Sequence, residues 1–129
     1  MKISPVVHFE MPYRDKKRLA KFYSRVLGWE MQMTGEEFGN YVLATTSPVD
    51  KKGMHRKKGA INGGFYPKGD YGTIPHVVVA VGKLEEQMKM VKKAGGKVRG
   101  KPMDIPGIGR FVMITDTEGN RVGMLQPKR

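Results

Sequence analysis

The stretch VVHFEMPYRDKKRLAKFYSRVLGWEM, residues 6–31, decides the fold. It begins with a β-branched and aromatic run over residues 6–11, which predicts a strand. Asp15 then stands where a helix N-cap is preferred, and Gly28 stands where a helix often ends in the left-handed conformation. Between them apolar residues recur at the spacing of one helical face, at Leu19, Phe22, Tyr23, Val26 and Leu27. The stretch therefore predicts a strand, a helix and the start of a second strand at Trp29.

The second half of the chain repeats this order. HVVVAV, residues 76–81, predicts a strand, and KLEEQMKMVKKAGG, residues 83–96, predicts a helix that stops at Gly95. His8 and His76 occupy the same place in the two halves, 68 positions apart. Three short strands are expected after each helix, at 29–34, 40–46 and 59–66 and then at 97–100, 110–116 and 121–126. The chain thus predicts an α+β fold of two βαβββ modules in tandem.

The chain length of 129 residues suits one domain. We expect a single domain over residues 1–129, with module 1 at about 1–67 and module 2 at about 75–129. One module alone is too small for a secure core, so the two should pack as one unit.

Composition narrows the class of protein. The chain has no cysteine, and its longest apolar run, VVVAV, is far shorter than a membrane span of about 20 residues. We therefore expect a cytoplasmic protein without membrane contact. The net charge of +12 favours anionic partners. One dense basic cluster, KKGMHRKK at 51–58, has no aromatic residue for stacking bases, so a solvated loop is favoured over a nucleic-acid site.

The first strand of each module has two different faces, because side chains alternate along a strand. Val7, Phe9 and Met11 share an apolar face on which a helix can dock, whereas His8 and Glu10 point the other way. In the second module the corresponding opposite face carries His76. These three polar side chains either line a site or simply face water.

Three phrases of the chain resemble the glyoxalase, bleomycin-resistance and extradiol-dioxygenase group, the vicinal oxygen chelate superfamily. They are HFEMP with LAKFYSRVLGWEM, then HVVVAV with AGGKV, and MDIPGIGRFVMITDTEGNRVGMLQP. The resemblance implies that the two modules form a curved, cup-shaped mixed sheet with the helices outside and the site in the hollow. It also implies a homodimer, which many members form.

Metal-dependent members of that group use four protein ligands, one in the first and one in the last strand of each module. His8 and His76 match the two first-strand positions, but Gly123 and residues 61–64 offer no carboxylate at the last-strand positions. Two imidazoles are too few for a catalytic divalent ion. We therefore predict no four-ligand metal site and no cofactor, with a divalent metal on His8, His76 and Glu10 as the alternative.

The function predicted from these residues is the binding of a small, anionic molecule by a glyoxalase- and bleomycin-resistance-like protein. His8, Glu10, His76 and Arg110 are the predicted ligand-binding residues, and Glu10 is the candidate catalytic residue. Arg110 is the last residue of KPMDIPGIGR, residues 101–110, which is expected to form a ligand-facing loop.

Two other functions stay open. One is a metal-dependent lyase, isomerase or dioxygenase-like enzyme using His8 and His76, and the other is a basic accessory protein that binds nucleic acid. The glycines Gly63, Gly64 and Gly123 either make room for a ligand or mark a close crossing of strands. Phe65, Tyr66 and Tyr71 are candidate apolar walls.

Overall fold

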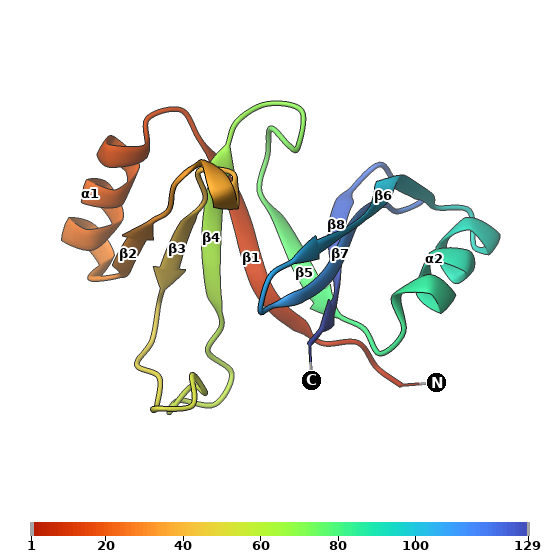
Figure 1. The fold of residues 1–129 in the computed structure, drawn as a ribbon, viewed down its shortest axis with the longest axis horizontal. Coiled ribbons are helices and arrows are strands. Elements are labelled where there is room, and N and C mark those ends of the chain that lie inside the picture. The colour runs from red at the N-terminus through yellow and green to blue at the C-terminus, as the bar shows by residue number, and fades with distance from the viewer. Residues whose placement is uncertain (1, 129) are drawn as a thin grey trace. The chain divides into compact units, whose positions relative to one another are not determined.

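The computed structural model describes residues 2–128, which divide into two compact units. One unit consists of residues 8–75, and the other joins the residues up to Val7 to those from His76 onward. Figure 1 shows the elements of each unit in chain order.

The helices and strands follow one another along the chain in the order that the sequence predicts. The first module contains β1 (Val6–Tyr13), α1 (Lys16–Leu27), β2 (Glu30–Met33), a short 3-10 helix η1 (Glu36–Phe38), β3 (Val42–Thr45) and β4 (Asn62–Pro67). The second contains β5 (His76–Ala80), α2 (Leu84–Lys93), β6 (Lys97–Ile105), β7 (Gly109–Thr115) and β8 (Arg121–Pro127). The α+β class and the two tandem βαβββ modules are therefore confirmed.

The strands of the first module pair in the order β2-β3-β4-β1. β1 and β4 are parallel, and the other two pairs are antiparallel. In the β1–β4 register Phe9 stands opposite Gly63 and Glu10 stands opposite Gly64. This register decides which side chains can meet on each face of the sheet.

The second module repeats the arrangement in the order β5-β8-β7-β6. β5 and β8 are parallel, and β7 pairs antiparallel with both β8 and β6. Val78 of β5 stands opposite Gly123 of β8. The two modules thus share their topology as well as their element order.

Helix α1 begins and ends where the sequence predicts. The side chain of Asp15 accepts a hydrogen bond of 3.0 Å from the backbone N–H of Arg18. Gly28 adopts a φ of 70°, and its N–H donates to the carbonyl of Ser24 at 3.2 Å. The helix packs through Leu19 and Tyr23 on a cluster of Phe9, Met11, Val42, Ala44 and Phe65.

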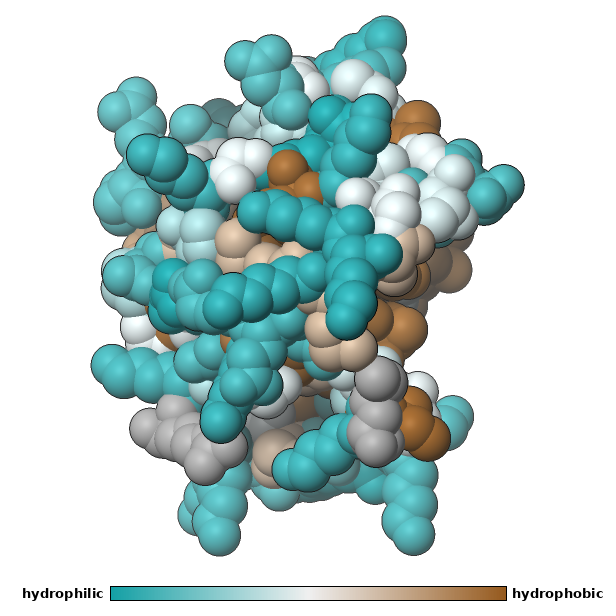
Figure 2. All heavy atoms as spheres, turned by 90° about the vertical axis from the view of Figure 1, so that its right-hand side faces the viewer, coloured by the Kyte–Doolittle hydropathy of each residue, from teal (hydrophilic) through white to brown (hydrophobic). Residues whose placement is uncertain are grey.

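Helix α2 packs on the core of its own module through Leu84, which is fully buried and clusters with the buried residues Val81, Val112 and Met124. Unlike Asp15 of α1, its N-cap residue Lys83 supplies no capping hydrogen bond, and the N–H of Leu84 donates instead to Oε1 of Gln126 at 2.8 Å. Hydrophilic side chains cover most of the molecular face that carries this helix (Figure 2). Neither helix within residues 2–128 has the length and hydrophobicity needed to cross a bilayer.

The expected loop at residues 101–110 is wrong. β6 extends to Ile105 and β7 begins at Gly109, so only residues 106–108 connect them. Met103 pairs with Phe111 and Asp104 pairs with Arg110, while the register shifts between Arg99 and Met103. The proline and glycine content predicted a loop, but an irregular β-hairpin tolerates Pro102 at a shifted position and turns at Gly107.

Candidate functional site

A buried carboxylate forms the centre of the candidate site. Glu10 lies on the face of β1 opposite to Phe9 and Met11, which pack towards α1. The residue is only 6% exposed. The hydroxyl of Tyr41 donates to its Oε2 at 2.7 Å, and the hydroxyl of Tyr71 donates to its Oε1 at 2.6 Å. Each carboxylate oxygen thus has a donor, as a buried charge requires.

Tyr41 reaches Glu10 because β4 carries a glycine at this point. A Cβ atom at Gly64 would overlap the Tyr41 ring, so the glycine lets the ring lie over the strand next to Glu10. Thr34 holds the backbone of Tyr41, since its N–H and its hydroxyl both donate to the Tyr41 carbonyl, at 2.9 and 2.6 Å. The Phe9 ring likewise occupies the space that a side chain at Gly63 would need. Close packing, rather than room for a ligand, therefore explains both glycines.

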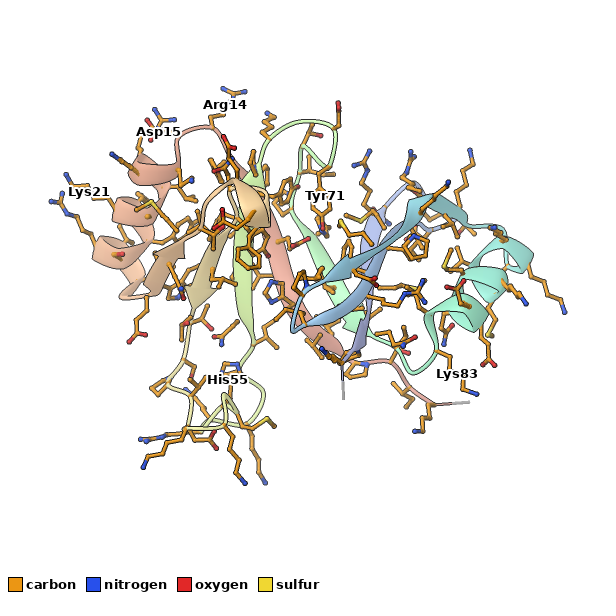
Figure 3. All side chains as sticks on the ribbon, in the orientation of Figure 1. Arg14, Asp15, Lys21, His55, Tyr71 and Lys83 are labelled. Atoms are coloured by element: carbon orange, nitrogen blue, oxygen red, sulfur yellow. The ribbon has the colours of Figure 1, made fainter. Side chains whose placement is uncertain are left out.

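Tyr71 comes from the segment that follows β4 (Figure 3). Gly69 and Gly72 exchange two backbone hydrogen bonds of 3.1 Å, which fold this segment into a tight turn. Tyr66 meets Tyr71 edge to face, with ring centroids 4.8 Å apart, and its hydroxyl donates to the Ile74 carbonyl at 2.7 Å. The turn and the neighbouring ring together fix the direction of the Tyr71 hydroxyl.

His8 joins the same network through Tyr41. Its Nε2 lies 2.8 Å from the Tyr41 hydroxyl oxygen. Because the Tyr41 proton is directed at Glu10, this oxygen accepts the hydrogen bond, and Nε2 of His8 carries the proton. In the neutral ring Nδ1 is then the acceptor nitrogen, a tautomer that we infer from the network. The hydrogen-bonded chain runs from His8 through Tyr41 and Glu10 to Tyr71, and we call these four residues the Glu10 centre.

Burial and charge keep both tyrosines in the donor form. Desolvation raises the pKa of the Tyr41 hydroxyl, and the negative charge of Glu10 raises it further. The same two causes, in the same order, raise the pKa of Tyr71. An ionised tyrosine beside Glu10 would place two negative charges together in a low-dielectric site. Both hydroxyls therefore remain protonated at neutral pH and hold Glu10 as the acceptor.

His76 lies in the other unit, at the start of β5. It is 7% exposed and points away from α2, because Val79 of β5 and Val81 directly after the strand pack in the cluster that contains Leu84 of α2. On this face the Phe111 ring closes over Gly123, 2.6 Å from where a Cβ would stand. Gly123 stands where metal-dependent members of the resembled group carry a carboxylate ligand. The space beside it is therefore occupied by the Phe111 ring of the same module.

Arg110 takes part in a different set of contacts. Its guanidinium lies 2.8 Å from the carboxylate of Glu85 on α2 and 3.5 Å from that of Asp104. It shares the face of β7 with Val112, which packs on α2. The structure therefore brings His8 and Glu10 together and directs Arg110 towards α2, so an anion-binding role for Arg110 stays a prediction.

The donor set does not fit a catalytic metal ion. In the part of the chain that the structure describes, no three histidine, aspartate or glutamate side chains come close enough to share an ion. Both oxygens of Glu10 accept tyrosine hydroxyls, whose raised pKa values make them poor metal ligands. A catalytic zinc-type site uses three protein ligands and an open position.

Sequence reasoning missed the two tyrosines as partners of Glu10. They are 31 and 61 positions away from it along the chain, so no local pattern connects them. Tyr71 was expected only as an apolar wall, and Tyr41 only as part of a strand. The one useful signal was Gly64, since a glycine in a strand often marks a close approach of another group.

The chain thus combines two βαβββ modules with a buried hydrogen-bonded network on the face of β1 opposite to α1. The chain belongs to the Glyoxalase/Bleomycin resistance protein/Dioxygenase superfamily, whose family model matches residues 6–124. The resemblance seen in the sequence is therefore confirmed over nearly the whole chain.

Individual curated proteins match only part of the chain. Two mycobacterial proteins, from Mycobacterium bovis and Mycobacterium tuberculosis, each carry the name "Putative glyoxylase CFP32" and are 36% identical to this chain over 52 residues. The match covers 40% of this chain and 20% of those proteins, so the chain spans only about a fifth of their length.

Solved structures share the fold at low sequence identity. A methylmalonyl-CoA epimerase of Streptomyces coelicolor, in complex with 2-nitronate-propionyl-CoA, has a TM-score of 0.70 at 12% identity and covers 99% of this chain and 100% of its own. The methylmalonyl-CoA epimerase of Mycobacterium tuberculosis has a TM-score of 0.68 at 13% identity, covering 96% and 88%. At such identities these structures establish the common fold alone.

Proposed function

We propose that this chain binds a small oxygenated molecule at the Glu10 centre, and that it does so without the four-ligand metal site of the glyoxalases. One observation carries the proposal: a buried carboxylate whose two oxygens accept tyrosine hydroxyls, one of which also contacts His8. Buried ionisable groups with strongly shifted neighbours concentrate at functional sites. Two tyrosines recruited from distant segments favour a positioned centre over a solvated sheet face.

The network suggests how the centre contacts a ligand. Hydrogen bonds run from Nε2–H of His8 to the Tyr41 hydroxyl and from that hydroxyl to Glu10, so a hydrogen bond between a ligand and His8 is coupled to both residues. In this proposal His8 is the group that meets the ligand, and Tyr41 and Glu10 fix its tautomer.

Charge and family point to the class of ligand. The net charge of +12 favours an anionic molecule. Structures of the same fold are named as epimerases of a CoA thioester, and the curated relatives are named as glyoxylases. We therefore choose an anionic oxygenated ligand. A binding role for His76 stays a prediction of the sequence. A homodimer and a cytoplasmic location stay predictions of the sequence.

Calorimetric titration with two probes tests the proposal. Methylmalonyl-CoA and the hemithioacetal of glutathione and methylglyoxal are titrated into the protein and into His8→Ala, Glu10→Gln and the control Glu86→Gln. Wild type should bind at least one probe, and the first two variants should lose at least about tenfold in affinity, or about 1.4 kcal/mol. The control should not change, because Glu86 is exposed on α2 and pairs with Lys83.

Two results would contradict the proposal. Wild-type protein that binds neither probe would refute the class of ligand. Unchanged binding in both variants, with a large loss of thermal stability, would show that the Glu10 centre only supports the fold.

A further inference from the structure

A second feature of the first module is independent of the Glu10 centre. The segment of residues 46–61, which we call the basic loop, connects β3 to β4. It carries five exposed cationic side chains, at Lys51, Lys52, Arg56, Lys57 and Lys58. Asp50 is the only acidic residue within it. A loop of this length between paired strands requires an explanation.

The basic loop is ordered by its own backbone. Val49 and His55 form an antiparallel bridge, and the N–H of Asp50 donates to the Met54 carbonyl at 2.8 Å. The turn between them closes at Gly53, which has a φ of 80° and donates to the Asp50 carbonyl at 3.0 Å. The cations therefore extend from a small hairpin rather than from an extended flexible strand.

The single acidic residue serves the turn and not the cations. Oδ1 of Asp50 accepts hydrogen bonds from the backbone N–H groups of Lys52 and Met54, at 2.9 and 3.0 Å. None of the five cations forms an ion pair with any residue between 2 and 128. Side chains that end in nitrogen spread outwards from the loop that carries His55 (Figure 3). The positive charge of the loop is thus unopposed and directed to solvent.

We propose that the basic loop binds the phosphate backbone of double-stranded nucleic acid without reading its sequence. Clustered Lys and Arg residues on an ordered element supply contacts to successive phosphates. An ordered loop also loses less conformational entropy on binding than a flexible one. The sequence alone favoured a solvated loop. The structure adds two observations: the loop forms a hairpin, and the Asp50 carboxylate accepts backbone hydrogen bonds instead of pairing with the cations.

The amino-acid composition of the basic loop favours a nucleic-acid duplex over other polyanions as the ligand. A single-stranded ligand needs aromatic platforms, and residues 46–61 contain no Phe, Tyr or Trp. A membrane surface needs an apolar face that inserts among the lipids, whereas Met54 is the loop's one large apolar side chain with high exposure, at 64%. Phosphate contacts by long cationic side chains require neither feature.

Fluorescence anisotropy with a labelled duplex of about 20 bp, titrated between about 50 and 200 mM salt, tests the proposal. The loop variant replaces Lys51, Lys52, Arg56, Lys57 and Lys58 by Gln. If each cation neutralises one phosphate, it should reduce the slope of log K against log salt by about 4.5, because each contact contributes about 0.9. Its affinity at the lowest salt should fall at least about 100-fold.

A matched control removes the same charge from the other module. It replaces Lys83, Lys89, Lys92, Lys93 and Lys97, on and beside α2, by Gln. We expect its affinity to stay within about fivefold of wild type, because charges that make no phosphate contact act only through a screened field. A third variant with Arg at the four loop lysines should retain wild-type binding. Circular dichroism confirms that each variant is folded.

Three results would overturn the proposal. Wild type that fails to bind the duplex at low salt would refute it directly. An equal loss in the loop variant and in the control would assign the binding to total charge. Loop-dependent binding to phosphatidylserine vesicles, without binding to the duplex, would assign the surface to membranes.

Discussion

Glu10 shows how a single buried charge is made compatible with the fold. The carboxylate has two tyrosine donors, and the chain makes room for one of them by placing Gly64 directly opposite in the register. A buried carboxylate without hydrogen-bond donors would lower the free energy of unfolding by several kcal/mol, about as much as removing one partner of a buried ion pair does. Gly64 is therefore needed to form the Glu10 centre, although its own atoms do not take part in the network.

Gly64→Ala tests this dependence. A Cβ at Gly64 would overlap the Tyr41 ring, so Tyr41 must move and its contacts with Glu10 and His8 must break. We expect a loss of about 1–3 kcal/mol in the free energy of unfolding, as for overpacking of a core. Urea denaturation measures it, with Gly82→Ala as the control, since nothing lies within 4 Å of a Cβ there. Equal stability of the two variants would show that Tyr41 adapts freely.

Alkaline titration tests the tyrosine donors. Tyr41 and Tyr71 have folded-state pKa values raised above 10.0, mainly by burial. The unfolded chain therefore releases their protons first, so their contribution to stability is complete below pH 10 and declines as the pH rises above it. Absorbance of tyrosinate should show that Tyr41 and Tyr71 are among the tyrosines that ionise only when the protein unfolds. Tyr41→Phe should remove one tyrosine from this late-ionising group.

The site was only partly predictable at this scale. Strand alternation correctly placed His8 and Glu10 on the face away from the helix, because that face depends on local periodicity alone. The tyrosine partners depend on the register of β1 and β4 and on a turn at Gly69–Gly72, which are long-range features. No periodicity in one sequence specifies them.

At the scale of elements, the two helices differ in how they begin. Asp15 caps α1, whereas Lys83 at the start of α2 makes no capping bond and places a positive charge at the positive end of the helix dipole. Its ion pair with Glu86, at 3.8 Å between exposed side chains, contributes little. The second helix is therefore held mainly by burial of Leu84.

Two substitutions separate capping from packing. Asp15→Ala should lower the free energy of unfolding by about 1 kcal/mol, and Lys83→Asp should raise it by about 0.5–1 kcal/mol by supplying the missing cap. Chemical denaturation of both variants measures these changes, with Lys89→Asp as a control for the added negative charge in the same helix. A stabilisation by the control as large as that of Lys83→Asp would assign the effect to net charge.

The elements also show where sequence prediction fails. Both helix ends of α1 follow from one residue each, Asp15 and Gly28, and were predicted correctly. The hairpin of β6 and β7 was taken for a loop because proline and glycine dominate residues 101–110. Its pairing depends on cross-strand partners such as Met103 and Phe111, which local composition does not reveal. Features set by one turn were predictable, and features set by strand pairing were not.

At the scale of the whole molecule, the division into units does not follow the division into modules. Residues before His8 group with the second module, and the N–H of Ala80 donates to the Pro5 carbonyl at 3.0 Å. β1 runs from Val6 to Tyr13 without interruption, so it contributes residues to both units. Unfolding of one unit would therefore break a strand that the other unit needs.

We accordingly predict that the chain unfolds in one cooperative step. Differential scanning calorimetry should give a single transition with an enthalpy of about 90 kcal/mol near 60 °C, from about 0.7 kcal/mol per residue. The van't Hoff and calorimetric enthalpies should agree, as in a two-state domain. Asp15→Ala in α1 and Lys83→Asp in α2 should each move this one transition, because a change in either unit acts on a common equilibrium. Two transitions of about half the enthalpy, each moved by only one of the variants, would show that the units are separate domains and that the continuity of β1 does not couple them.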